Sequence, residues 1–133
     1  MVFEHGFHGR TLLGMSMTSK VKPYKLGFGP FAPEIYRLPY PYLYRRPAGL
    51  AADEAAFRRE LEESFATHVA AEKVACVVME LVLGECGFVV APGAYVKVLI
   101  ELCRQHGILF VADEIQTGFG RTGRMWAMEH YGL

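Results

Sequence analysis

Short, continuous apolar runs along the chain predict buried strands. Residues 74–83 read VACVVMELVL, a valine-rich run that is typical of a parallel strand covered on both faces, and Gly84 is expected to end it. Residues 108–112 (ILFVA) form a second run of this kind, which stops at Asp113 and Glu114. The opening MVFE fits the last part of a further strand.

Two longer stretches repeat their apolar residues with the period of a helix. In residues 53–69, apolar side chains recur at every fourth position between charged ones: Phe57, Leu61, Phe65 and Val69. The second stretch covers residues 92–106, and Gly107 follows it where a left-handed C-cap residue belongs. Shorter helical patterns cover residues 11–19 and 126–131.

The order of these elements predicts the fold class. A strand, a helix and a strand joined by short connections imply parallel strands with a right-handed crossover, and therefore an α/β fold. Two full strands and an opening fragment make a narrow sheet, which normally needs more strands to be stable. We therefore expect these 133 residues to be one part of a larger structure.

Residues 20–50 break this regular pattern. They hold six of the seven prolines, together with many aromatic residues, and no helical or strand period runs through them. A connection of this length inside a compact domain is usually functional. We expect a long loop that covers a site or an interface.

Composition and charge exclude several classes of protein. The chain is 52% hydrophobic and 13% aromatic, which is too apolar for a disordered segment. Lys plus Arg and Asp plus Glu both total 14, and a chain without net charge has no field to attract nucleic acid as its main partner. We see neither a signal peptide nor a membrane span, and expect a soluble, cytoplasmic protein without a membrane partner.

Cysteine and histidine spacing gives no metal or redox motif. Cys76, Cys86 and Cys103 include no C-x-x-C pair, so we expect free thiols in a reducing compartment. His5 and His8 lie close to an acidic residue, but no further ligand follows at a useful spacing. We interpret them as hydrogen-bonding loop residues and predict no metal site.

Polar residues stand where the predicted strands end, which is where open α/β sheets bind their ligands. Five residues have this position: Glu80, Glu85, Asp113, Glu114 and Gln116. Strand-end carboxylates also cap helices or face solvent, so both interpretations stay open. A magnesium-dependent nucleotide hydrolase is excluded because the chain has no G-x-x-x-x-G-K-[ST] loop. Residues 118–123 (GFGRTG) match G-x-G-x-x-G, but poor context favours a flexible loop or a close backbone approach over a dinucleotide site.

Four ordered blocks carry a resemblance to a known family: GFHGRT at 6–11, KPYKLGFGPFAPEIYRLPYPY at 22–42, MELVLGECGF at 79–88 and VADEIQTGFGRTGRMWAMEHYG at 111–132. Together they resemble the class III, ornithine-type aminotransferases, and the second block is most similar to the 4-aminobutyrate aminotransferase branch. The resemblance implies a pyridoxal-phosphate enzyme of fold type I. Residues 1–133 would be a fragment of its large cofactor-binding domain, a partial three-layer α/β structure around a parallel sheet, with the 20–50 loop inside it.

The resemblance also assigns cofactor-binding residues. Asp113, the predicted catalytic residue, matches the carboxylate that keeps the ring nitrogen of pyridoxal phosphate protonated, as an electron sink requires. Phe7 matches the aromatic residue that stacks on the cofactor ring. Gln116 matches the side chain near the cofactor's phenolic oxygen, and Glu80 matches a group that supports it.

Two further matches concern the substrates. Arg10 matches the arginine that receives the substrate carboxylate in the 4-aminobutyrate branch, a task that suits the guanidinium fork. Glu85 matches the glutamate that the family pairs with an arginine far toward its C-terminus. The implied reaction moves an amino group from an ω-amino acid such as 4-aminobutyrate to a 2-oxo acid, and the family implies a homodimer.

The chain also departs from the family pattern. The family's Schiff-base lysine follows a later strand and its glycine-rich phosphate turn comes earlier, and no lysine here matches the catalytic one: Lys20, Lys22, Lys25, Lys73 and Lys97. In the third block, Leu81 replaces a proline, Leu83 a glutamine and Cys86 a glycine, and a cysteine adopts a positive φ reluctantly. We expect the 133 residues not to transaminate alone; the alternative is a non-catalytic remnant or interaction module that pairs through exposed sheet edges.

Overall fold

The computed structural model describes residues 1–132, and residue 133 lies outside the described part. The helices are α1 (Leu12–Met17), α2 (Glu54–Thr67) and α3 (Gly93–His106), with 3-10 turns at Leu43–Arg45, Ala71–Lys73 and Ala127–Tyr131. The strands are β1 (Val2–Phe3), β2 (Arg37–Leu38), β3 (Cys76–Met79), β4 (Val82–Leu83), β5 (Val89–Val90) and β6 (Leu109–Ala112). None of the helices in residues 1–132 is long and apolar enough to cross a membrane.

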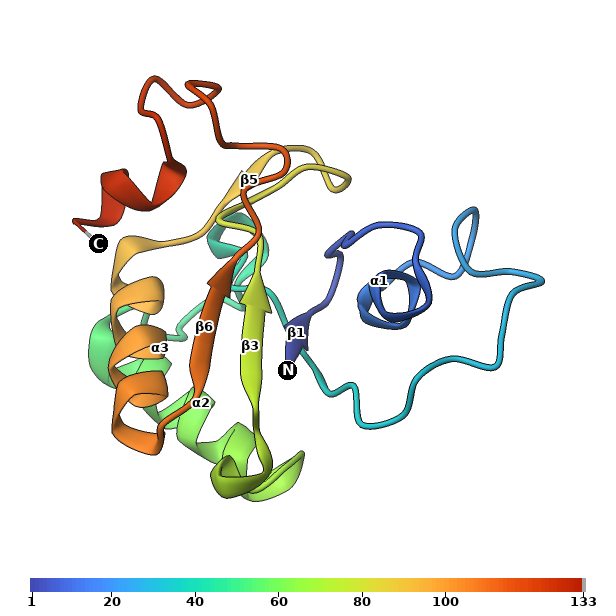
Figure 1. The fold of residues 1–133 in the computed structure, drawn as a ribbon. Helices are drawn as coiled ribbons and strands as arrows, with labels where there is room; N and C mark the ends of the chain where they lie inside the picture. The colour runs from blue at the N-terminus through green and yellow to red at the C-terminus, as the bar shows by residue number, and fades with distance from the viewer. Residues whose placement is uncertain (133) are drawn as a thin grey trace.

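Four parallel strands lie side by side at the centre of the chain (Figure 1). β3 pairs with β6 in parallel, from Cys76 opposite Leu109 to Met79 opposite Ala112. On the other side of β3, the backbone N–H of Val78 donates to the Met1 carbonyl at 2.9 Å, and β1 in turn pairs in parallel with β2. The order β2, β1, β3, β6 confirms the predicted parallel α/β arrangement.

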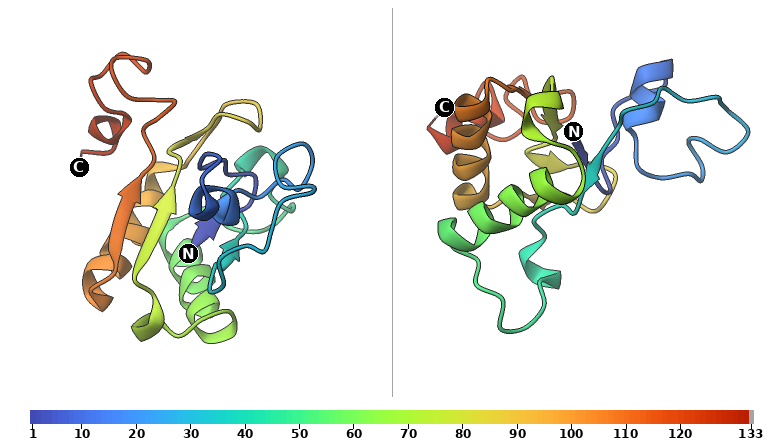
Figure 2. Two further views of the ribbon diagram at one scale, coloured as in Figure 1. Left: turned by 45° about the vertical axis from the view of Figure 1, so that its right-hand side comes forward. Right: turned by 90° about the horizontal axis from the view of Figure 1, so that it is seen from below.

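Two helices cover one face of these strands. α2 and α3 lie side by side (Figure 2) and are joined by ion pairs from Arg58 to Glu101 and from Lys97 to Glu54. Asp53 caps α2, because its carboxylate accepts the backbone N–H of Ala56 at 2.8 Å. Alternate side chains of β3 point into the buried core beneath the helices, where they meet these residues: Phe57, Leu61, Tyr95, Val96, Leu99 and Leu102.

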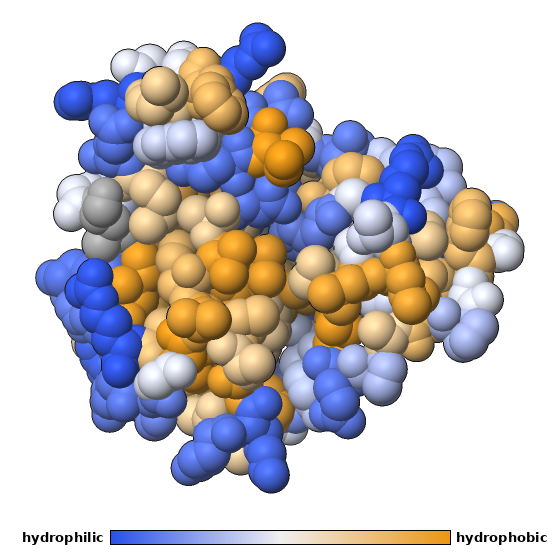
Figure 3. Space-filling view, in the orientation of Figure 1, coloured by the Kyte–Doolittle hydropathy of each residue, from blue (hydrophilic) through white to orange (hydrophobic). Residues whose placement is uncertain are grey.

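The prediction that residues 108–112 form a strand buried on both sides is wrong, because one face of β6 is exposed. Leu109 is 69% exposed and Val111 is 43% exposed. Side chains alternate across a strand, both long helices lie on one side, and no other element in residues 1–132 covers these two side chains. Figure 3 shows the resulting concentration of apolar side chains over β3 and β6.

The apolar run at 74–83 was predicted to be one strand, and this prediction is wrong. The run forms two strands that belong to different sheets. β3 ends at Met79, and β4 pairs with β5 in an antiparallel arrangement. Between them the buried Tyr40 hydroxyl lies 3.1 Å from the Glu80 carbonyl oxygen and 3.3 Å from that of Leu81. The Tyr40 hydroxyl thus serves backbone carbonyls at the break between the two strands, and burial raises the pKa of Tyr40 above the usual tyrosine value.

Cys86 lies in the turn between β4 and β5, and its backbone does not have the unfavourable conformation that its replacement of a glycine suggested. The left-handed backbone conformation falls on the next two residues, with φ of 90° at Gly87 and 57° at Phe88, and Cys86 does not adopt a positive φ. The cysteine therefore fits this turn without the penalty that a left-handed conformation carries. All three cysteines of the chain are free thiols.

The 20–50 segment contains more structure than its sequence suggests. It supplies β2, and its Leu38 and Tyr40 side chains are buried in the core. Residues 20–36 follow an irregular path away from the sheet (Figures 1 and 2), whereas the part after β2 returns to α2, where Arg46 pairs with Glu60. Two-residue strands flanked by prolines leave no periodic pattern, which explains why β2 was missed.

Candidate active site

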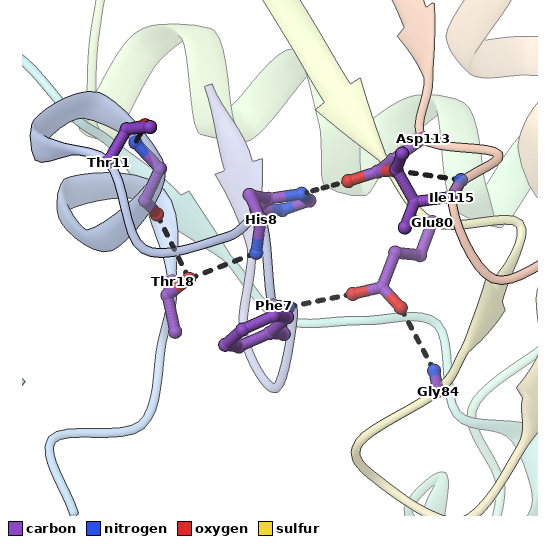
Figure 4. Close-up of polar contacts among 9 residues, drawn as sticks. Phe7, His8, Thr11, Thr18, Glu80, Gly84, Asp113 and Ile115 are labelled. Atoms are coloured by element: carbon purple, nitrogen blue, oxygen red, sulfur yellow. Dashed lines mark hydrogen bonds and ion pairs between the residues drawn. The ribbon is translucent and has the colours of Figure 1, made fainter. Parts of the chain in front are cut away.

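Asp113 lies at the C-terminal end of β6, where the sheet continues into a loop. Its backbone N–H still pairs with the β3 strand, donating to the Met79 carbonyl at 2.8 Å. Its side chain turns toward the segment after β1: Oδ2 lies 2.8 Å from Nδ1 of His8, and Oδ1 accepts the backbone N–H of Ile115 at 3.2 Å (Figure 4). The strand end therefore presents a half-buried, oriented carboxylate.

His8 is a site residue that the sequence analysis missed. Its side chain is 2% exposed and faces Asp113. Gly6 permits this arrangement, because a Cβ at that position would lie 2.9 Å from Nε2 of the His8 ring and 3.1 Å from the Phe3 carbonyl oxygen. The available signal was position: His8 follows β1, and the C-terminal ends of parallel strands meet at one edge of a sheet.

The contact with His8 keeps Asp113 ionised. The hydrogen bond from His8 lowers the pKa of the Asp113 carboxyl below its usual value, and desolvation opposes this effect without cancelling it. An ionised carboxylate can only accept hydrogen bonds, so Nδ1 of His8 carries the proton that joins the two side chains. The site thus holds a fixed negative charge at neutral pH.

Glu80 clamps together two loops of the site from its buried position after β3. Its Oε1 accepts the backbone N–H of Phe7 at 2.7 Å, and its Oε2 accepts that of Gly84 at 2.9 Å (Figure 4). Gln116 packs against the same glycine: a Cβ at Gly84 would lie 3.3 Å from Cγ of Gln116 and 3.6 Å from Oε2 of Glu80. Gly84 therefore lies against both Gln116 and Glu80, where a side chain would crowd Gln116.

The pH dependence of stability provides a test of the buried Glu80 carboxylate. Burial raises its pKa above the usual 4.5, and the two backbone hydrogen bonds only partly offset this effect. The folded chain therefore holds the proton more tightly than the unfolded chain, so the contribution of Glu80 to stability is fully present below pH 4.5 and is lost as the pH rises through the folded pKa.

We expect the free energy of unfolding of the natural chain to fall, relative to that of Glu80→Gln, as the pH rises. Glutamine does not titrate, so this variant removes the linkage while keeping the side-chain size. Urea unfolding at about pH 4 and about pH 7 measures the difference. A difference that stays constant between the two pH values would show that folding does not raise the pKa of Glu80.

The predicted substrate residues lie at the exposed rim of the site. Phe7 packs against Tyr24, with ring centroids 4.8 Å apart, and the guanidinium carbon of Arg10 lies 5.2 Å from the centre of the same Tyr24 ring. Glu85 accepts a hydrogen bond from the Tyr24 hydroxyl. Within residues 1–132, Arg10 makes no ion pair, which leaves its guanidinium available to an external anion.

Glu114 stabilises the fold, in contrast to its neighbour Asp113. Its carboxylate accepts hydrogen bonds from the Thr117 hydroxyl at 2.6 Å and from the backbone N–H groups of Ala127 and Met128 at 3.0 and 2.9 Å. It thereby caps the turn at Ala127–Tyr131 and joins it to the end of β6. Capping, one of the two interpretations of strand-end carboxylates, applies to this residue.

In the GFGRTG segment at 118–123, the Trp126 side chain lies close to the backbone of Gly118. A Cβ at Gly118 would lie 2.7 Å from Cζ3 of Trp126 and 2.9 Å from the Glu114 carbonyl oxygen. The glycine is needed to admit the indole ring, which supports the interpretation made from sequence. In the described part of the chain, no three His, Cys, Asp or Glu side chains form a group that could hold a metal ion.

The six predicted site residues thus come from three separate segments, residues 7–10, 80–85 and 113–116, and lie around one end of the sheet. Asp113, Glu80 and Gln116 form the inner part, and Arg10 and Glu85 form the rim; Phe7 connects the two. The family model described as Aminotransferase class-III matches residues 1–133. The chain belongs to the class III aminotransferases.

Individual relatives agree with this family. The aminotransferase chain is 54% identical over 131 residues to a "Probable 4-aminobutyrate aminotransferase" of Bacillus subtilis, an alignment that covers 97% of this chain and 30% of the relative. It is 45% identical to a 4-aminobutyrate aminotransferase of Mycobacterium leprae, over 100% of this chain and 30% of the relative. The chain therefore spans about a third of the length of these relatives.

Solved structures agree with the fold of the aminotransferase chain. An amine transaminase from an uncultivated Pseudomonas species, in its PLP-bound form, superposes with a TM-score of 0.85 at 34% identity. An (S)-enantioselective omega-transaminase from Thermomicrobium roseum also gives 0.85, at 36% identity. Each match covers 99% of this chain and 30% of the other. They confirm the predicted α/β architecture of a fold type I transferase.

Proposed function

We propose that this chain forms part of a pyridoxal-phosphate-dependent aminotransferase that moves an amino group from an ω-amino acid such as 4-aminobutyrate to a 2-oxo acid. The observation that carries the proposal is the Asp113 carboxylate at the end of β6, which His8 orients through a contact of 2.8 Å beside the Phe7 loop. The relatives named as 4-aminobutyrate aminotransferases, at 45% and 54% identity, support the choice of amino donor.

We propose that the inner part of the site supplies the groups that surround the ring of pyridoxal phosphate, while its lysine and phosphate turn come from outside these residues. When bound, this cofactor withdraws electrons from the substrate carbon while its ring nitrogen is protonated. Asp113 supplies the negative charge that holds this proton, and its oxygens keep lone pairs free beyond the contacts with His8 and Ile115. Phe7 supplies an aromatic face, and Gln116 supplies an amide for the phenolic oxygen.

The rim of the site fits the carboxylate of the amino donor. An ω-amino acid carries its carboxylate several bonds from the amino group, so the group that binds it must lie away from the reacting carbon. We propose that Arg10 binds this carboxylate, because its guanidinium is exposed and makes no ion pair within residues 1–132. Glu85 lies on the other side of Tyr24 at the same rim.

The 133 residues are expected to need another segment for turnover. Lys20 donates to the Glu85 carbonyl at 2.8 Å, Lys25 to the Thr18 carbonyl at 3.2 Å, and Lys97 pairs with Glu54 on the far helices. No lysine of the described chain hydrogen-bonds with Asp113. We therefore propose that a lysine outside these residues supplies the amine for the cofactor, and that the purified chain alone does not convert 4-aminobutyrate.

A chimeric enzyme tests the proposed function. The matching 30% of the Bacillus subtilis relative is replaced by the present chain, so that the remaining 70% of the parent supplies its own lysine. We expect the chimera to convert 4-aminobutyrate and a 2-oxo acid. A chimera that folds and binds pyridoxal phosphate but shows no turnover with any ω-amino acid would contradict the proposal. The unmodified parent is the positive control.

One observation favours a second candidate, a non-catalytic interaction module. The face of β6 exposes apolar side chains, with Leu109 and Val111 uncovered in residues 1–132. In the aminotransferase proposal this face packs against other parts of a homodimeric cytoplasmic enzyme, a location that the three free thiols also suit. An inactive chimera, together with binding of the isolated chain to an intact aminotransferase in analytical ultracentrifugation, would favour the module.

A further inference from the structure

Tyr24 lies at the centre of the rim, although no sequence motif marks it as a functional residue. Its ring contacts Phe7 on one side and the Arg10 guanidinium on another, and its hydroxyl donates to the Glu85 carboxylate. The residue comes from the 20–50 segment, and all three partners lie outside that segment. Tyr24 thus makes the side-chain contacts that attach this segment to the rim, beside the hydrogen bond from Lys20 to the Glu85 carbonyl.

The two charged partners of Tyr24 carry opposite charges and contact different parts of its side chain. Arg10 lies over the face of the ring, as cations do, and this contact does not use the hydrogen-bonding edge of its guanidinium. Glu85 is bound instead to the hydroxyl at the edge of the ring. Lys20 further fixes this loop by donating to the Glu85 carbonyl at 2.8 Å.

We propose that Tyr24 is a positioning residue that holds Glu85 away from Arg10 and so keeps Arg10 open for a substrate carboxylate. Within residues 1–132 the Tyr24 hydroxyl is the side-chain partner of the Glu85 carboxylate, so removing the hydroxyl from this chain leaves Glu85 as a competitor for the Arg10 guanidinium. A bound Glu85 would then block the incoming carboxylate. The inference rests on the proposed function, because it takes Arg10 as the group that receives the substrate.

The first test detects the Tyr24–Glu85 contact directly and needs no ligand. The hydrogen bond to Glu85, aided by desolvation and by the Glu85 charge, raises the pKa of Tyr24 above 10.0, and Arg10 opposes this effect. The pKa of Tyr24 is read from NMR of chain labelled at the tyrosine ring carbons, with Tyr24→Phe assigning the signal. We expect Glu85→Gln to bring the pKa of Tyr24 back toward 10.0. An unchanged pKa would overturn the inference.

The second test measures binding of butyrate, a carboxylate without an amino group, to the 133-residue chain. The Arg10 guanidinium signal in NMR reports occupancy in the natural chain, Tyr24→Phe and the double variant Tyr24→Phe/Glu85→Gln. We expect Tyr24→Phe to weaken binding about 2- to 5-fold, the strength of an exposed ion pair that now competes. Removing the competing charge in the double variant should restore the affinity.

Tyr36 offers a matched control, because its hydroxyl donates to the Glu34 carboxylate within the same segment. Tyr36→Phe removes an equivalent tyrosine–glutamate bond away from Arg10 and should leave butyrate binding unchanged. If Tyr24→Phe binds butyrate as the natural chain does, the inference fails and the proposed function stands. If the natural chain does not bind butyrate at Arg10, both the assigned role of Arg10 and the inference are overturned.

Discussion

Replacing Asp113 by asparagine in the chimeric enzyme is expected to lower kcat/KM on the order of 100-fold, the scale of losing one preorganised charge-stabilising group. Asparagine keeps the shape of the side chain and can still contact His8, but it carries no negative charge. The ring nitrogen of the cofactor would then lose its proton, and the electron sink would weaken. The effect should fall on turnover, because the loops around the site keep their other contacts with Glu80 and Thr18.

The Asp113→Asn experiment needs a matched control and a check on folding. Glu62→Gln makes the same carboxylate-to-amide change at an exposed position of α2 and should leave kcat/KM unchanged. Urea unfolding of both chimeras separates a chemical effect from a loss of folded enzyme. If Asp113→Asn retains the activity of the parent chimera, Asp113 does not hold the proton on the ring nitrogen.

Replacing Phe57 by alanine is expected to lower the free energy of unfolding of the 133-residue chain by about 3 to 5 kcal/mol. Phe57 is fully buried where α2 meets α3, with its ring centroid 5.2 Å from that of Tyr95 in an edge-to-face contact. The Arg46 guanidinium lies on another side of the same ring, 5.0 Å from its centre. Alanine would leave a cavity that these rigid neighbours cannot fill.

A loss of this size removes a large share of the stability that is typical of a chain of this length, about 5 to 15 kcal/mol, and would unfold much of the chain only at the low end of that range. Phe28→Ala is the control, because it makes the same change at an exposed phenylalanine of the 20–50 segment. Urea midpoints of the natural chain and both variants give the comparison. Equal midpoints for Phe57→Ala and Phe28→Ala would mean that the α2–α3 contact is not part of the stable core.

The helices were predicted well because their signals are local. The four-residue spacing from Phe57 to Phe65 lies inside α2, Asp53 caps its first turn, and the helix ends at Thr67, before the predicted Val69; Gly107 ends α3 with a φ of 69°, as its position indicated. Strand predictions were weaker. The run at 74–83 contains nothing that marks its break, because the break depends on the Tyr40 hydroxyl, which comes from about 40 positions earlier in the chain.

In the site, too, residues within sequence motifs were identified, and residues that matter through contacts with distant parts of the chain were missed. Family resemblance identified six residues by their motifs, and the structure brings them to one end of the sheet. His8 and Tyr24 were missed because their importance lies in contacts with Asp113 and Glu85, each more than 60 positions away. Spacing along the chain cannot reveal such pairs, whereas the rule that parallel strand ends converge could have suggested His8.

The adjacent carboxylates at the end of β6 are exposed to two kinds of natural selection. Glu114 binds only groups of its own chain, so mutations there reduce the amount of folded protein in the cell. In the proposed function Asp113 faces the cofactor, so a change such as Asp113→Asn is expected to leave abundance high and to lower activity. In a mutational scan, scores for abundance and for activity would agree at position 114 and separate at position 113. A lineage that abandoned catalysis would be free to change Asp113 while still retaining Glu114.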